Sequence, residues 1–213
     1  MLEVRDLAVS FDGTSVLDGV SLDVAAGEIV ALLGPSGSGK STVLRAIAGL
    51  LRPDSGRIVI AGADVTDVAT HRRSVGMVFQ DEQLFPHLDV GHNVEFGLRM
   101  AGVKPPVRRR RVDDLLDLVG LDGFARRSID RLSGGEAKRV ALVRSLAPAP
   151  SVLLLDEPLS GLDSDLRSRV GDEIASALRA TSTTAVWVTH DTTEAVEVAD
   201  RVVQLDDLRA PDG

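Results

Sequence analysis

The stretch GPSGSGKST, Gly34 to Thr42, fits the phosphate-binding pattern G-x-x-x-x-G-K-[ST]. It follows the apolar run EIVALL and precedes VLRAIAGLL, so it lies between an expected strand and an expected helix, as the pattern requires. Its glycines let backbone N–H groups wrap an anion, while Lys40 reaches the terminal phosphates and the Ser41 hydroxyl can ligate Mg²⁺. The sequence therefore predicts a nucleotide site made by Gly34, Pro35, Ser36, Gly37, Ser38, Gly39, Lys40, Ser41 and Thr42.

Apolar runs on both sides of this stretch indicate an α/β fold with a mostly parallel central sheet. EIVALL, SVLLLD and TAVWVT are continuous apolar runs, as expected of strands that are covered on both faces. Residues 1–25 instead alternate apolar and polar positions around two DG turns. This alternation predicts antiparallel strands at one edge.

The pattern becomes helical between Asp81 and about Ala147, where RRVDDLLDLVGL repeats apolar residues at spacings of three and four. We therefore expect one domain over residues 1–213. Its α/β core comprises residues 1–80 and 148–213, and residues 81–147 form an inserted helical subdomain.

Composition and charge exclude several functional classes. The chain has 213 residues, a net charge of −8 and no cysteine, so it has no disulfide framework and no general attraction to nucleic acid. Its longest apolar runs are far shorter than the roughly 20 residues that span a bilayer. The basic run Arg108 to Arg111, after Pro105 and Pro106, is interpreted as a solvated helix start rather than a binding patch.

A second motif, VLLLDEP, places two acidic residues at the end of a buried strand. Adjacent carboxylates are costly there unless they serve a cation or a reacting water. We expect Asp156 to be a Mg²⁺ partner, directly or through water, and Glu157 to orient or deprotonate the attacking water. The alternative is a strand that ends at a solvent edge with acidic residues of no special function.

A third motif, LSGGE, lies ahead of LLLDEP, and with it the chain resembles the nucleotide-binding subunit of an ABC transporter from Met1 to about Leu205. The resemblance implies the P-loop NTPase fold of ABC ATPases. It also implies that two subunits form a homodimer around two ATP molecules, each with Mg²⁺. The signature residues Ser133, Gly134, Gly135 and Glu136 would then contact the ATP held by the partner subunit.

The resemblance implies roles for four further residues. Phe11 falls where the family stacks an aromatic ring on adenine, although a core residue at a strand end is the competing interpretation. Gln80 matches the glutamine that reaches Mg²⁺ and the water, and His190 matches the histidine that contacts the γ-phosphate. Asp163, in LSGLD, matches the carboxylate of the loop between subunits. The other histidines, His71, His87 and His92, are interpreted as structural.

Within the family, LFPHLDVGHNVEFGL and VTHDTTEAVEVADRV are similar to bacterial importers of ions and small solutes. This resemblance implies permease subunits that dock near Gln80–Gly97, an extracytoplasmic solute-binding protein, and a cytoplasmic location on the inner face of the plasma membrane. We expect no C-terminal regulatory domain and no nucleic-acid partner. The alternatives are an exporter or lipoprotein-release ATPase, a soluble ABC-type ATPase in DNA repair or translation, and a P-loop kinase.

The signature also has a local interpretation. Ser133 and Glu136 form S-x-x-E, a capping box in which each side chain bonds the backbone N–H of the other residue. Family members often have glutamine at position 136, whereas Glu136 brings a negative charge toward an anionic nucleotide. The sequence thus predicts a helix start that caps itself and also closes on a neighbour's ATP.

Overall fold

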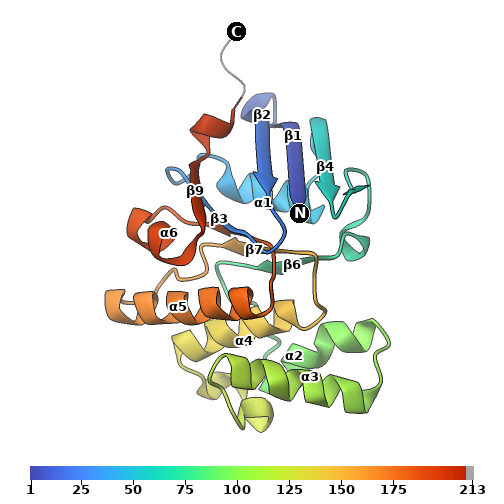
Figure 1. Ribbon diagram of the computed structural model, residues 1–213, viewed down its shortest axis with the longest axis vertical. Coiled ribbons are helices and arrows are strands. Elements are labelled where there is room, and N and C mark those ends of the chain that lie inside the picture. Colours follow the sequence, from blue (N-terminus) through green and yellow to red (C-terminus); the bar gives the residue numbers. More distant parts are fainter. Residues whose placement is uncertain (210–213) are drawn as a thin grey trace.

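The computed structural model describes residues 1–209, whose strands lie in two separate sheets (Figure 1). The antiparallel sheet has the order β2-β1-β4-β5 and contains β1 Leu2–Phe11, β2 Thr14–Val24, β4 Ser55–Ile60 and β5 Ala63–Asp64. The parallel sheet has the order β6-β7-β8-β3-β9 and contains β6 Val75–Val78, β7 Val152–Asp156, β8 Ala185–Val188, β3 Ile29–Leu33 and β9 Arg201–Gln204. The predicted α/β fold with a parallel central sheet is confirmed.

The N-terminal strands follow the predicted alternation. Leu2, Val4, Leu7 and Val9 are buried, and β1 pairs antiparallel with β2 across the turn at Asp12 and Gly13. These strands form a sheet of their own and do not hydrogen-bond to an edge of the parallel sheet. The sequence predicted their direction and their buried face, but alternation carries no information about which sheet a strand joins.

The helices lie on both sides of the parallel sheet, with α2, α3 and α4 grouped at the end away from the antiparallel sheet (Figure 1). None of the helices described is long and apolar enough to cross a bilayer. The α-helices are α1 Lys40–Ala48, α2 Val90–Met100, α3 Pro105–Leu118, α4 Gly134–Leu146, α5 Ser164–Ala180 and α6 Thr192–Val198. Short 3₁₀ turns occur at Thr70–Arg72, Phe124–Arg126, Ile129–Arg131 and Asp206–Leu208.

Strand β7 shows why the central runs are apolar throughout. Val152 and Leu154 pack into the cluster that contains α1 and the antiparallel sheet, whereas Leu153 and Leu155 pack into the cluster that contains α2 to α5. Successive side chains of a strand point to opposite faces, so a strand covered on both faces needs apolar residues at every position. All of β7 is buried accordingly.

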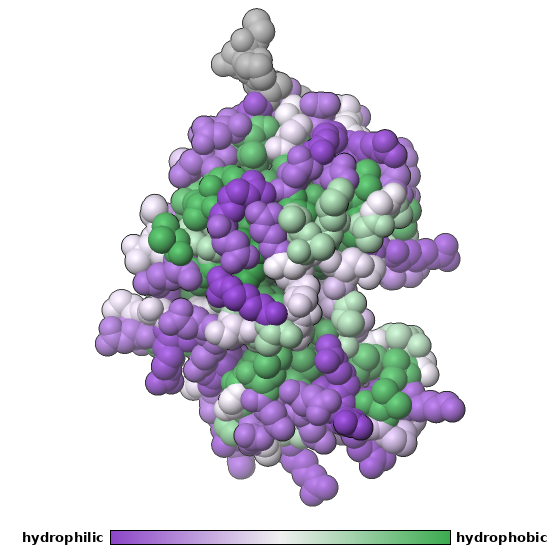
Figure 2. Space-filling model, viewed as in Figure 1, coloured by the Kyte–Doolittle hydropathy of each residue, from purple (hydrophilic) through white to green (hydrophobic). Residues whose placement is uncertain are grey.

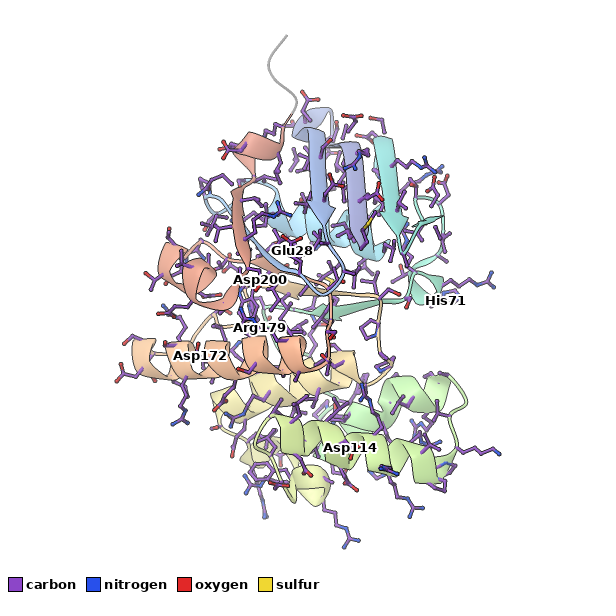
Figure 3. The ribbon with its side chains drawn as sticks, viewed as in Figure 1. Glu28, His71, Asp114, Asp172, Arg179 and Asp200 are labelled. Atoms are coloured by element: carbon purple, nitrogen blue, oxygen red, sulfur yellow. The ribbon has the colours of Figure 1, made fainter. Side chains whose placement is uncertain are left out.

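The end of the parallel sheet where β3 begins is fixed by ionic contacts (Figure 3). Asp200 accepts from the Ile29 N–H at 2.9 Å and lies 3.4 Å from Arg179 of α5, while Glu28 pairs with Arg201 at 2.7 Å. The hydrogen bonds from Arg201 lower the pKa of Glu28, so this carboxyl is ionised at neutral pH. These contacts hold α5 and the start of β9 to the start of β3, at the end of the sheet opposite the carboxyl ends of the strands.

The interpretation of the basic run as a solvated helix start is wrong for Arg108. Helix α3 does begin at Pro105, but the Arg108 side chain is only 16% exposed, lies 2.9 Å from Glu95 of α2 and donates to the Val103 carbonyl at 2.7 Å. Helical geometry turns this one arginine of the run toward α2. On the face of the helical region in view, apolar side chains are also exposed (Figure 2), and α2 and α3 include the exposed Met100 and Val107.

Candidate functional site

The predicted site residues follow adjacent strands of the parallel sheet. Gln80 follows β6, and Asp156 and Glu157 lie at the end of β7. His190 follows β8, and the phosphate loop that begins at Gly34 follows β3. The carboxyl ends of parallel strands meet at one edge of a sheet, where ligands of open α/β sheets bind. Segments up to 156 residues apart in sequence, Gly34 and His190 for example, therefore lie at the same edge.

The phosphate loop fits closely against the antiparallel sheet. Gly39 has a φ of +107°, and a Cβ at this position would lie 2.8 Å from Cδ2 of Leu17. Both the conformation and the space therefore require glycine. Helix α1 begins at the next residue, Lys40, so its first-turn N–H groups point toward the loop and favour an anion.

The Lys40 side chain is buried and is hydrogen-bonded to the backbone of the phosphate loop. Its Nζ donates to the carbonyl oxygens of Gly34 at 2.6 Å and Pro35 at 2.7 Å. Burial lowers the pKa of Lys40, while the nearby carboxylates of Glu157 and Asp156 raise it. The Lys40 ammonium is therefore shielded from solvent and lies close to two carboxylates.

Ser41 and Asp156 form a pair suited to a hard cation. The Ser41 hydroxyl donates to Oδ1 of Asp156 at 2.8 Å. Burial raises the pKa of Asp156, and the hydrogen bond from Ser41 partly offsets this. A hydroxyl and a carboxylate beside a phosphate loop are the oxygen donors that Mg²⁺ takes together with nucleotide phosphates and water. Within residues 1–209, no three acidic, histidine or cysteine side chains are grouped so that they could hold a metal ion by themselves.

Glu157 and His190 face each other across the ends of β7 and β8. The Glu157 Oε1 lies 3.3 Å from Nδ1 of His190, and both side chains line a cavity of about 240 Å³ together with Gln80. Glu157 has a φ of +44°, which is strained for a residue with a Cβ, and its N–H donates to the Val188 carbonyl at 3.0 Å. The strained backbone aims the carboxylate out of the strand and into the cavity.

Sequence reasoning missed a buried carboxylate that lines the same cavity as His190. Glu194 is 8% exposed and accepts from Nε1 of Trp187 at 2.6 Å. Burial raises the pKa of Glu194. Nearby, Asp191 caps α6 by accepting from the N–H groups of Thr193 and Glu194. The D-x-x-E spacing after His190 was the available signal for a helix start at this position.

The structure also places Phe11, Asp163 and two of the remaining histidines. Phe11 is the last residue of β1 and is 47% exposed, so the core interpretation is wrong for it. Asp163 is the N-cap of α5 and accepts from the Leu166 N–H at 3.0 Å, a local role that the sequence analysis did not assign. His71 lies at the edge of the molecule (Figure 3) and is exposed, while His92 Nδ1 lies 2.7 Å from Asp89.

The LSGGE stretch begins helix α4, and its capping contacts lie within the stretch itself. The predicted capping box is confirmed: Ser133 Oγ accepts from the Glu136 N–H at 3.3 Å, and Glu136 Oε2 accepts from the Ser133 N–H at 2.7 Å. A Cβ on Gly135 would lie 3.2 Å from Val170 of α5, so this glycine permits close packing of the two helices. Within the described residues, no hydrogen bond or ion pair joins Ser133 to residues 34–42.

Loss of this cap has a predictable cost. We expect Ser133→Ala to lower the free energy of unfolding by roughly 1 kcal/mol, because the Glu136 N–H loses its acceptor. Urea denaturation without nucleotide measures this. Glu136→Gln is the control, since an amide oxygen still caps the Ser133 N–H. Equal stability of Ser133→Ala and the unmodified chain would show that water replaces the cap at no cost.

These geometries agree with comparisons to known proteins. A family model described as ABC transporter matches residues 17–160, which include the phosphate loop, the LSGGE helix start and the Asp156–Glu157 pair. The chain belongs to the ABC transporter family. Two relatives carry the name Fe(3+) ions import ATP-binding protein FbpC. The one from Streptomyces avermitilis is 54% identical over 96% of this chain, and the one from Escherichia coli K12 is 44% identical over 96%.

The chain spans 59% of the length of each of these two ABC transporter relatives. Among solved structures, the ATP-binding cassette MJ0796 is 31% identical, with a TM-score of 0.83 over 100% of this chain and 97% of that one. It was solved as a dimer in a post-hydrolysis state bound to ADP and phosphate. The described residues 1–209 therefore share the ABC ATPase fold with that structure.

Proposed function

We propose that this chain binds and hydrolyses ATP and that its ATPase cycle powers transport through separate membrane subunits. The observation that carries the proposal is the convergence of Lys40, Ser41, Asp156, Glu157 and His190 at one edge of the parallel sheet. Lys40 and the α1 N-terminus would hold the phosphates. Glu157, next to His190, would take the proton from the attacking water.

Mg²⁺ is the metal that fits the donor set, with Ser41 as a ligand and Asp156 as a ligand or a partner through water. When bound, it would neutralise charge on the β- and γ-phosphates. Gln80 lines the same cavity as Glu157 and would contact the metal and the water from the β6 side. Phe11, exposed at the end of β1, would stack on the adenine.

A second subunit would complete each nucleotide site. Among the described residues, Ser133 makes no hydrogen bond to the phosphate loop of its own subunit, so the first-turn N–H groups and the Ser133 hydroxyl would be available to an anion held by the partner. The dimeric state in which the ATP-binding cassette MJ0796 was solved supports this arrangement. ATP would favour the closed dimer because both subunits contact the γ-phosphate, and hydrolysis would remove that contact. Asp163 would meet the partner at the same interface.

The segment Gln80–Gly97 is the proposed contact with the membrane subunits. Two cations of α4 bind it: Lys138 lies 3.2 Å from Glu82, and Arg144 donates to the carbonyls of Gln83 at 2.7 Å and Glu82 at 3.0 Å. A movement of the signature helix would therefore move this loop. We assign residues 81–147 to a helical subdomain that transmits the movement and residues 1–80 and 148–213 to the nucleotide-binding core.

Import is favoured over export by the names of the ferric-ion import relatives. In this assignment the chain is peripheral on the inner face of the plasma membrane, and an extracytoplasmic protein delivers the solute. The test is purification with the accompanying permease subunits, followed by ATPase assays with the solute-binding protein and Fe³⁺. Stimulation only by a substrate on the cytoplasmic side would favour the exporter alternative, and ATPase activity without any membrane partner or solute response would favour a soluble ABC-type ATPase.

The charge at position 136 should affect closure. We expect Glu136→Gln to tighten the ATP-bound dimer about two- to fivefold, because it removes one negative charge from the signature region and so weakens the repulsion of the nucleotide by roughly 0.3–1 kcal/mol. Analytical ultracentrifugation with ATP measures the dimer dissociation constant. Weaker or unchanged dimerisation would show that this charge does not face the partner's nucleotide.

A further inference from the structure

Both carboxylate oxygens of Glu136 have partners. Oε2 accepts from the main-chain N–H of Ser133 at 2.7 Å, and Oε1 accepts from Nη1 of Arg127 at 3.2 Å. The hydrogen bond from Ser133 lowers the pKa of Glu136, so the side chain is ionised at neutral pH. The negative charge at the start of α4 is thus held in one orientation, turned back into its own subunit.

Arg127 is itself held in place. Its guanidinium stacks over the Phe124 ring at 3.6 Å from the centroid, and its carbonyl accepts from the Val90 N–H at 3.0 Å. Arg139, the other cation near Glu136, is engaged in an ion pair with Glu173 of α5. Within residues 1–209, Glu136 is the carboxylate that lies within ion-pair distance of Arg127.

We propose that Arg127 is a positioning residue that holds the Glu136 carboxylate in the cap and neutralises it, so that the signature can approach the partner subunit's nucleotide. The proposal rests on the function assigned above. A free carboxylate at this position would repel the γ-phosphate, whereas the paired one leaves the first-turn N–H groups of α4 facing the anion. Ser133 Oγ accepts a hydrogen bond in the cap and still has its own O–H to donate, so capping and phosphate binding are compatible.

The first step of the test is a double-mutant cycle in the hydrolysis-deficient Glu157→Gln protein. Arg127→Gln should raise the ATP-dependent dimer dissociation constant about fivefold at low salt, because the released Glu136 carboxylate can then turn toward the polyanionic nucleotide. In a Glu136→Gln background, the same change should cost less than about twofold, because no carboxylate remains to be held. The difference between the two costs should shrink at high salt.

Arg126→Gln is the matched control, because it removes the same charge from the adjacent exposed position and should leave dimerisation unchanged. The melting temperature of Arg127→Gln without nucleotide should lie within about 4 °C of that of Arg126→Gln, as expected for the loss of exposed contacts, which separates positioning from loss of folding. Equal costs of Arg127→Gln in both backgrounds would overturn the proposal, since Arg127 would then act without Glu136. Failure of the Glu157→Gln parent to dimerise with ATP would overturn the proposed function as well.

Discussion

Glu157→Gln should retain ATP binding, lose about 10²- to 10⁴-fold in ATPase rate, and convert the protein into a stable ATP-bound dimer. The carboxylate lies 3.3 Å from His190 and lines the cavity with Gln80, so it is placed to accept the proton of an attacking water. The amide keeps the shape and the hydrogen-bonding reach of the side chain but cannot accept that proton. The barrier to hydrolysis rises while the contacts to the γ-phosphate remain, and the closed state persists.

Two measurements check this result: phosphate release under saturating ATP and Mg²⁺, and size-exclusion chromatography with ATP and with ADP. Glu197→Gln is the matched control, because it makes the same chemical change at an exposed position of α6 and should hydrolyse ATP at the original rate. A Glu157→Gln protein that remains monomeric with ATP would contradict the proposed sandwich of two subunits. A variant that still hydrolyses ATP at the original rate would remove Glu157 from the reaction.

The sequence could predict those parts of the site that depend on local pattern and strand order. The phosphate loop is a continuous motif, and the apolar run before it predicted its position after a buried strand, β3. Asp156 and Glu157 end another such run, and parallel strands bring their carboxyl ends together. The S-x-x-E spacing likewise predicted the capping box at Ser133, because both hydrogen bonds of the box form within one helical turn.

The rest depends on contacts that sequence spacing does not encode. Arg127 precedes Glu136 by nine residues, and only the turn that stacks it on Phe124 brings the two charges together. Arg108 lies four residues before Val112, on the buried face of α3, but its partner Glu95 belongs to α2, and only the packing of the two helices brings them together. The positive φ of Glu157 could not be predicted from the sequence either. A non-glycine residue takes such a φ because of tertiary contacts, and not because its own side chain favours that conformation.

Lys40→Ala should raise the ATP dissociation constant about 10- to 100-fold, which corresponds to the loss of charge-assisted hydrogen bonds of roughly 1.5–3 kcal/mol. In the free protein, Nζ donates to the Gly34 and Pro35 carbonyls inside the loop. Burial lowers the pKa of this ammonium, so its charged form is disfavoured by its surroundings. The same confinement gives the cation a strong interaction with phosphates once a nucleotide supplies the opposite charge.

This argument predicts opposite effects of Lys40→Ala on affinity and on stability. Nucleotide binding, measured by a fluorescent ATP analogue, should weaken, whereas the melting temperature without nucleotide should be unchanged or higher because a buried cation is removed. Lys104→Ala is the control: it removes the same charge from an exposed position before α3 and should alter neither quantity. Unchanged ATP affinity in Lys40→Ala would remove the phosphate-loop assignment. A large loss of stability would instead show that the hydrogen bonds from Lys40 to the Gly34 and Pro35 carbonyls hold the loop together. The lysine would then stabilise the fold as well as bind the nucleotide.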